Sequence, residues 1–252
     1  MLFRSGKTPG EALQLRALCH QCTSIGAAST LTDAFAAMVA ERPQLQSFAR
    51  RFAGLPVRNS GTLGGNIANG SPIGDSMPLL IALRASVVLS CVEGERSLPL
   101  EHLYTGYRKN VMSATEVITH IQIPHPTPTE FSQVYKISKR HEDDISAVCL
   151  ALCLHLQGGT VQKASIGVGG VAATPVRARQ TEAALTGQDW NETTVQTAIS
   201  TVRQEFSPIS DMRASASYRT QVLGNLLHRF WLESQGQAVV DLQQLSLEDF
   251  AA

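Results

Sequence analysis

Alternation of apolar and polar residues predicts β-strands in both halves of the chain. Residues 117–123 alternate with a period of two and end at Pro124, which predicts a half-buried strand. Residues 86–92 are rich in valine, and the Glu93-Gly94 pair that follows is a turn signal. Further strands are predicted in four stretches: 13–25, 131–137, 145–157 and 164–171. We expect the first of these to form a pair of strands leading to Gly26.

Segments of helical composition separate these strands. In the stretch 32–39, Thr32 or Asp33 is a suitable helix N-cap, and Pro43 suits the first turn of a second helix over 43–52. Further helices are predicted in four stretches: 77–83, 176–185, 195–206 and 214–231. Because strands and helices are mixed in each half, the pattern predicts an α+β fold.

A proline-rich segment marks the best candidate for a domain boundary. Pro124, Pro126 and Pro128 stand close together between two predicted strands. We therefore predict two parts, 1–127 and 128–252. The second is expected to be an antiparallel sheet with helices on one face.

Composition and charge narrow the classes of function. The chain has 252 residues, 43% of them hydrophobic and 17% charged, with a formal net charge of zero. These values are typical of a soluble globular protein. A net charge of zero does not favour a positively charged surface that would bind nucleic acid. No apolar run reaches the length of about 18 residues that a membrane span needs, and the start has no apolar signal core. A cytoplasmic protein is expected. Cys19 and Cys22 have the CxxC spacing of a metal site, but no second pair follows among the five cysteines, which favours buried free thiols.

The stretch 58–75 carries the most informative chemistry. It is crowded with glycine, asparagine, serine and threonine, so no long regular element is expected there. Glycines let a backbone approach a ligand, and successive N–H groups in such turns bind phosphate. Composition alone leaves two readings open, a dinucleotide-binding loop and a plain connecting loop. The stretch lacks the Lys-Ser/Thr end of a nucleotide-triphosphate loop. Glycines at 167 and 169 after a predicted strand are explained more simply by packing than by a dinucleotide fold.

Several motifs in order resemble the FAD-binding part of molybdenum hydroxylases, closest to the small subunit of xanthine dehydrogenases. The resemblance covers about residues 25–231. Its motifs are 52–58 with 61–67, then 71–75, then 135–146, then 169–182, and finally 211–219. The segment 140–145 is similar to the Arg-Arg-Glu-Asp-Asp-Ile motif of the xanthine dehydrogenases, with His141 in place of an arginine. The implied fold is a partial FAD-binding domain, its second subdomain, followed by a domain like the C-terminal domain of the CO dehydrogenase flavoprotein.

The resemblance also implies roles for individual residues. Phe52 would pack near the flavin, Ile118 would touch its ring, and Lys136 would lie near its polar edge. Asp75 would accept a hydrogen bond from a hydroxyl group of the cofactor. The remaining cofactor-binding residues would hold the pyrophosphate or lie close to it: Thr62, Leu63, Gly64, Gly65, Asn66 and Asn69. Arg140, Asp143 and Asp144 would face the ring, where charge tunes its potential.

The function implied by the resemblance is electron relay rather than substrate oxidation. A molybdenum cofactor on a large subunit would hydroxylate a purine, [2Fe–2S] clusters on another domain would pass electrons to FAD, and NAD would accept them. No catalytic residue and no metal ligand is predicted on this chain, and a higher oligomer of the complex is expected. Two alternatives stay open. One is a flavoprotein of another molybdenum hydroxylase, acting on carbon monoxide, aldehydes or nicotinate. The other is a docking fragment without flavin, since the family's first FAD subdomain and [2Fe–2S] segment are not recognised here.

Overall fold

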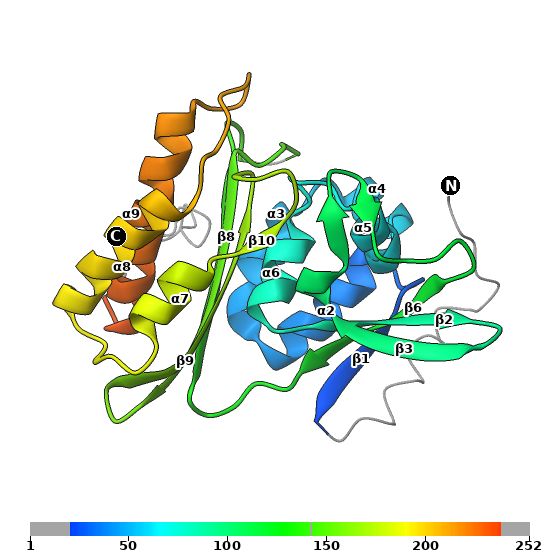
Figure 1. Cartoon of the computed structure of the whole chain (residues 1–252), viewed down its shortest axis with the longest axis horizontal. Coiled ribbons are helices and arrows are strands. Elements are labelled where there is room, and N and C mark those ends of the chain that lie inside the picture. The colour runs from blue at the N-terminus through cyan, green and yellow to red at the C-terminus, as the bar shows by residue number, and fades with distance from the viewer. Residues whose placement is uncertain (1–20, 142, 238–252) are drawn as a thin grey trace, which may run out of the picture.

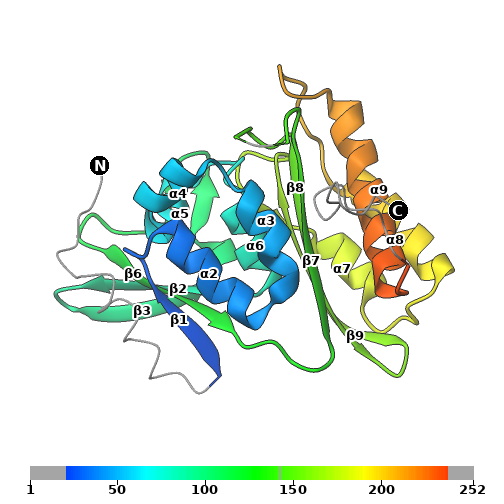
Figure 2. The same ribbon diagram turned by 180° about the vertical axis from the view of Figure 1, so that it is seen from behind.

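Two mixed layers of strands and helices make up the protein. The computed structural model describes residues 21–141 and 143–237. Figure 1 shows a sheet of long strands with the helices of the C-terminal half on one side and the N-terminal half of the chain on the other. Figure 2 shows the same layering from behind. The predicted α+β fold is therefore confirmed, and a C-terminal antiparallel sheet carries its helices on one face.

The first sheet lies in the N-terminal half, and its strands are all antiparallel. Its order is β1-β6-β2-β3. The strands are β1 (Cys22–Gly26), β2 (Ser86–Cys91), β3 (Gly94–Pro99) and β6 (Val117–Pro124). Ile121 pairs with Ile25 on one side and with Val87 on the other, and all three side chains are buried. One apolar face of the sheet thus packs on the core, as the alternation in 117–123 predicts.

Short helices make up the rest of the N-terminal half, and one of them, α5, contacts strand β6 of this sheet. They are α2 (Leu31–Glu41), η2 (Pro43–Leu45), α3 (Gln46–Arg51), α4 (Leu55–Ser60), α5 (Leu63–Asn69), α6 (Ser76–Ala82) and η3 (Leu100–His102), with the small strands β4 (Tyr104–Gly106) and β5 (Lys109–Asn110) beyond them. Helix α2 begins earlier than expected, because the Thr30 hydroxyl accepts from the Asp33 N–H and so forms the N-cap. Neither Thr32 nor Asp33 has that role.

The second sheet is a four-stranded antiparallel sheet in the C-terminal half. Its order is β10-β9-β8-β7. Its strands are β7 (Glu130–Ile137), β8 (Val148–Gln157), β9 (Thr160–Gly169) and β10 (Val176–Arg177), and its helices are α7 (Arg179–Leu185), α8 (Glu192–Glu205) and α9 (Ala216–Ser234). Leu150 and Leu152 of β8 pack toward these helices, whereas Cys149 and Ala151 join the core of the N-terminal half. Burial of both faces explains the nearly unbroken apolar run of β8.

Two glycines let helix α6 lie directly on strand β9. A Cβ atom at Gly167 would stand 2.0 Å from the Pro78 carbonyl oxygen, and one at Gly169 would stand 2.9 Å from Pro78 Cγ. Gly167 and Gly169 belong to β9 itself, and no helix follows them directly. The spacing that imitates a dinucleotide motif therefore reflects helix–sheet packing, as expected.

A buried ion pair joins the two halves at the start of β7. The Arg42 side chain is 2% exposed, and its Nε and Nη2 donate to the two carboxylate oxygens of Glu130 at 2.7 and 3.0 Å. Nη2 also donates to the Pro124 carbonyl at 2.9 Å. Glu130, Cys153 and His155 place possible ligand atoms within 4.8 Å of one another. Because the guanidinium already occupies both oxygens of Glu130, this trio is better explained as part of the interface.

Several predicted boundaries were wrong, for local reasons. Val176 and Arg177 pair with β9, so the predicted helix 176–185 begins only at Arg179. The predicted helix 43–52 is divided into a 3-10 turn and α3, and it ends at Arg51. Of the predicted strand pair 13–25, only residues from 21 onward lie within the described part, and they form β1.

The expectation of free, buried thiols holds for only part of the cysteines. Cys149 and Cys153 are free and buried, and burial raises the pKa of Cys149 well above its ordinary value and that of Cys153 to about 12. Cys91 is free but only half-buried, and Cys22 is disulfide-bonded, which the prediction missed. Cys19 lies outside the described residues.

Candidate functional site

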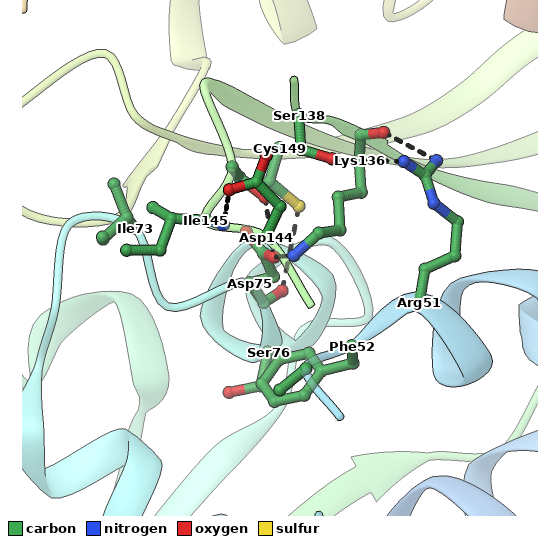
Figure 3. A network of polar contacts seen from close by, with 12 residues as sticks. Arg51, Phe52, Ile73, Asp75, Ser76, Lys136, Ser138, Asp144, Ile145 and Cys149 are labelled. Carbon is green, nitrogen blue, oxygen red and sulfur yellow. Dashed lines mark hydrogen bonds and ion pairs between the residues drawn. The ribbon is translucent and has the colours of Figure 1, made fainter. Parts of the chain in front are cut away.

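An ion pair buried between the two halves is the centre of the site. Lys136 Nζ on β7 donates to Asp75 Oδ2, just before α6, at 2.7 Å. The Ser146 hydroxyl donates to the same oxygen at 2.7 Å. Both charged side chains are 5% exposed. Figure 3 shows Lys136 reaching across the interface toward Asp75. The structure therefore brings together the two residues that the motifs of the separate halves supplied.

The second carboxylate oxygen of Asp75 has no partner within the described chain. Oδ1 is buried and accepts no hydrogen bond, whereas Oδ2 accepts two. A buried carboxylate oxygen without a donor costs free energy, since nothing replaces its hydration. The arrangement suits a ligand that brings an N–H or O–H group to Oδ1. Ser146 was not singled out from the sequence, although it ends the motif 135–146.

The glycine-rich stretch folds into a short capped helix rather than an open nest. Helix α5 begins after Thr62, whose hydroxyl accepts from the Gly65 N–H at 3.1 Å. The N–H groups of Leu63 and Gly64 donate to the carbonyls of Ser29 and Ala27. All three N–H groups thus have acceptors inside the chain. In this structure these three N–H groups are therefore not free backbone donors for a pyrophosphate.

Packing within the chain also accounts for three positions in this stretch. Leu63 is fully buried in the core of the N-terminal half. A Cβ atom at Gly64 would stand 2.4 Å from that of Ala27, and one at Gly65 would stand 2.8 Å from the capping hydroxyl of Thr62. Gly64 is thus needed for the contact with Ala27 and Gly65 for the cap. Neither glycine requires a ligand to explain it.

Polar side chains remain accessible along α5. Asn69 is exposed, and Asn66 is half-buried with its Oδ1 accepting from the Ser76 hydroxyl at 2.6 Å. Thr62 is half-buried at the start of the helix. Helix α5 contacts β6, the strand on which Ile118 lies half-buried. The predicted roles toward a ligand stay predictions for all of these positions: Thr62, Leu63, Gly64, Gly65, Asn66, Asn69 and Ile118.

Phe52 lies in an aromatic cluster beneath the site. Its ring centroid is 4.9 Å from that of Phe35 and 6.0 Å from that of Phe48, and it is 6% exposed. Figure 3 draws Phe52 near the ion pair. Most of its surface is thus used in the core, and its predicted contact with a flavin stays a prediction.

The charged segment after β7 is held against the N-terminal half. The Asp144 carboxylate accepts from the N–H groups of Arg140 and Ile145 at 2.8 and 2.9 Å. These hydrogen bonds, led by the one from Arg140, lower the pKa of Asp144. Asp143 has a φ of 49°, and a Cβ atom at Gly54 would stand 2.3 Å from its carboxylate. The segment therefore has a defined local structure, and Glu142 lies outside the described residues.

Arg51 contacts the segment that carries Lys136, and the sequence did not predict this contact. From the end of α3 it donates to the Lys136 carbonyl at 2.9 Å, the Ser138 hydroxyl at 3.3 Å and the His141 carbonyl at 3.2 Å. The signal available in the sequence was weak, since arginines near a helix end are common. Figure 3 shows Arg51 on the side of Lys136 away from Asp75.

Two domain families match the two halves of the chain. Residues 16–126 match the FAD-binding domain in molybdopterin dehydrogenase. Residues 133–234 match the C-terminal domain of the CO dehydrogenase flavoprotein. The chain belongs to the FAD-binding flavoproteins of the molybdenum hydroxylases. FAD is the cofactor of this flavoprotein family.

Relatives of this flavoprotein act on different substrates. Over 189 residues, 72% of the chain, it is 38% identical to the nicotinate hydroxylase hnxS of Emericella nidulans. Over 152 residues, 59% of the chain, it is 39% identical to the xanthine dehydrogenase/oxidase of Gallus gallus. These matches span only 14% and 11% of those relatives. Over 192 residues, 76% of the chain, it is 32% identical to the carbon monoxide dehydrogenase medium chain of Afipia carboxidovorans, and covers 66% of it.

A solved structure resembles the flavoprotein over most of its length. The carbon monoxide dehydrogenase from Hydrogenophaga pseudoflava, in a form lacking the Mo-pyranopterin moiety, matches with a TM-score of 0.81 and 29% identity. The match covers 88% of this chain and 77% of that one. The residues present also fit FAD on their own terms, because the unpartnered Asp75 Oδ1 and the buried Lys136 ammonium offer an acceptor and a cation side by side.

Proposed function

We propose that this flavoprotein holds FAD against the interface of its two halves and relays electrons within a molybdenum hydroxylase. The observation that carries the proposal is the buried Asp75–Lys136 pair with an unpartnered carboxylate oxygen. Asp75 Oδ1 would accept a hydrogen bond from an O–H or N–H group of FAD. Lys136 would place positive charge near the polar edge of the ring, where added electron density is stabilised.

The protein's part in the chemistry is to bind and orient. FAD, when bound, accepts and gives up electrons, and the ring system itself supplies that reactivity. Lys136 and Ser146 hold the Asp75 carboxylate in one orientation at the buried interface. The side chains of Thr62, Asn66 and Asn69 would contact the phosphate and sugar portions from the exposed side of α5.

The finer proposal is a flavoprotein of the xanthine dehydrogenase type. Its support is the segment 140–145, similar to the motif of xanthine dehydrogenases, together with the relative from Gallus gallus. In this proposal a molybdenum-bearing large subunit oxidises a purine, [2Fe–2S] clusters carry the electrons, and NAD takes them from the flavin site. The complex is proposed to be a higher oligomer in the cytoplasm. Within the described residues, no helix is both long and apolar enough to cross a membrane.

A nicotinate-oxidising complex is the second candidate. The 38% identity to the nicotinate hydroxylase favours it. The similarity to a carbon monoxide dehydrogenase medium chain leaves carbon monoxide as a further candidate substrate. The substrate is bound on another part of the complex, so the residues of the flavin site serve every member of the class equally well.

Anaerobic reduction of the purified natural complex separates these candidates. We expect xanthine to bleach the flavin absorption band and added NAD to restore it. Bleaching by nicotinate, an aldehyde or carbon monoxide, with none by xanthine, would contradict the xanthine dehydrogenase proposal but keep the relay. A complex without any flavin band would favour the docking fragment instead.

A further inference from the structure

The segment 211–219 forms a polar cluster whose role the proposed site does not explain. The Ser215 hydroxyl caps α9 by accepting from the Tyr218 N–H at 3.2 Å. The Asp211 carboxylate accepts from the Arg213 N–H at 2.8 Å and from Arg219 Nη2 at 2.6 Å. The Arg213 side chain also donates to Asp211, from Nε to Oδ2 at 3.0 Å, and this bond is the largest of the contacts that hold the pKa of Asp211 well below its ordinary value. Asp211 is therefore a charged anchor for Arg219.

Arg219 is buried, and its guanidinium binds backbone at two strand ends. The residue is 1% exposed. Its Nη1 donates to the Ala147 carbonyl at 2.6 Å and to the Gly170 carbonyl at 2.7 Å. Ala147 stands just before β8, and Gly170 just after β9. One guanidinium thus ties the start of one strand to the end of its neighbour.

Both strand ends also hold the turn that presents Asp75. Ala147 follows Ser146, whose hydroxyl donates to Asp75 Oδ2 at 2.7 Å. The Gly170 N–H donates to the Pro72 carbonyl at 2.9 Å, in the turn that leads to Asp75. Arg219 therefore binds Gly170, whose own N–H holds the turn, and Ala147, which is next to Ser146, although it does not touch Asp75 itself.

The backbone at Gly170 is shaped for this contact. Its φ is +83°, and a Cβ atom there would stand 2.4 Å from the Ala147 carbonyl oxygen and 3.2 Å from Arg219 Nη1. Only glycine lets the two carbonyls converge on one guanidinium. Arg219 Nε is buried without a partner in the described chain, so the guanidinium binds through Nη1 and Nη2.

We propose that Arg219 is a positioning residue for the flavin site, fixing from α9 the two strand ends that hold the Asp75 turn against Lys136. The inference deepens the proposed function and rests on it. Lysine at 219 would keep the charge, but its single ammonium group lacks the planar fork that reaches both carbonyls and Asp211 together.

The test compares Arg219→Lys with Arg229→Lys in the natural flavoprotein. Arg229 lies on the same helix, partly exposed, and pairs with Glu233. We expect Arg219→Lys to weaken FAD binding, measured by flavin fluorescence, by at least about tenfold, since hydrogen bonds to charged groups are lost. Arg229→Lys should leave FAD affinity unchanged. Equal FAD affinity in both variants would overturn the inference.

A double-mutant cycle separates positioning from general stability. If Arg219 acts through Asp75, then Arg219→Lys should weaken FAD binding much less when Asp75 is already Asn. Additive losses in FAD affinity would show a merely structural role. Should Arg219→Lys fail to fold, Asp211→Asn, which removes the carboxylate partner of Arg219 and also that of Arg213, replaces it in the same cycle with the same two outcomes.

Amide exchange in the FAD-free protein keeps this inference distinct from the proposed function. We expect the Gly170 N–H to exchange about tenfold faster in Arg219→Lys than in Arg229→Lys, because its contact with Pro72 loosens. Faster exchange in a protein that binds no FAD would leave the positioning contact standing and refute the flavin role. Unchanged exchange together with normal FAD binding would refute the positioning role alone.

Discussion

Replacing Lys136 by Met is expected to lower the free energy of unfolding by about 3 to 5 kcal/mol, because it leaves a buried carboxylate without its cation. Asp75 is 4% exposed, and Ser146 would be its only remaining side-chain donor among the described residues. FAD affinity should fall as well, because the turn that presents Asp75 loses its partner. Urea unfolding followed by circular dichroism measures the first effect and flavin fluorescence the second.

Lys139→Met is the matched control, three positions further along the chain. Lys139 is exposed, and within the described residues its ammonium donates to the Met212 carbonyl at 2.7 Å. Its loss should cost no more than about 1 kcal/mol. Adding Asp75→Asn to Lys136→Met should recover much of the lost stability, since no buried charge is then left alone. Similar costs for Lys136→Met and Lys139→Met would show that the pair is not the buried ion pair described here.

Gly167→Ala is expected to destabilise the protein by about 3 kcal/mol, through overpacking between α6 and β9. The added methyl group would stand 2.0 Å from the Pro78 carbonyl oxygen, and a backbone atom yields less easily than a flexible side chain. The displaced helix carries Asp75 at its start, so FAD affinity should drop together with stability. Thermal unfolding monitored by circular dichroism measures the first effect.

The same substitution at Gly106 provides the control for this prediction. A Cβ atom there meets nothing within 4 Å, and its φ is not positive. Gly106→Ala should leave stability within about 1 kcal/mol of the parent. If Gly167→Ala is equally harmless, α6 does not rest on β9 as closely as the structure shows.

Hydrophobic pattern was sufficient to predict the long strands but not the short ones. The run that became β8 is buried on both faces, and such runs stand out in any sequence. Strand β3, with the sequence GERSLP, has almost no apolar side chain because it lies at an exposed sheet edge. Strand β10 spans two residues and was merged into the helix after it. Strands defined mainly by their neighbours leave little pattern of their own.

The sequence likewise predicted some residues of the site and not others. The motif resemblance supplied both Asp75 and Lys136, and the structure brings them together. Pattern alone could not show that Leu63 enters the core or that Gly64 is needed beside Ala27, because glycines that approach a ligand and glycines that approach a neighbouring turn look identical in sequence. Arg51 and Arg219 were beyond prediction for another reason, since each binds carbonyls more than 45 positions away, and any residue has a carbonyl.

FAD titration of the natural flavoprotein, followed by visible absorption, tests the central claim most directly. The account predicts stoichiometric FAD binding with a perturbed flavin spectrum, and clearly weaker binding in both Lys136→Met and Asp75→Asn. Two results would contradict it. One is a full-length protein, within its complex, that takes up no FAD, and the other is FAD binding that neither substitution changes.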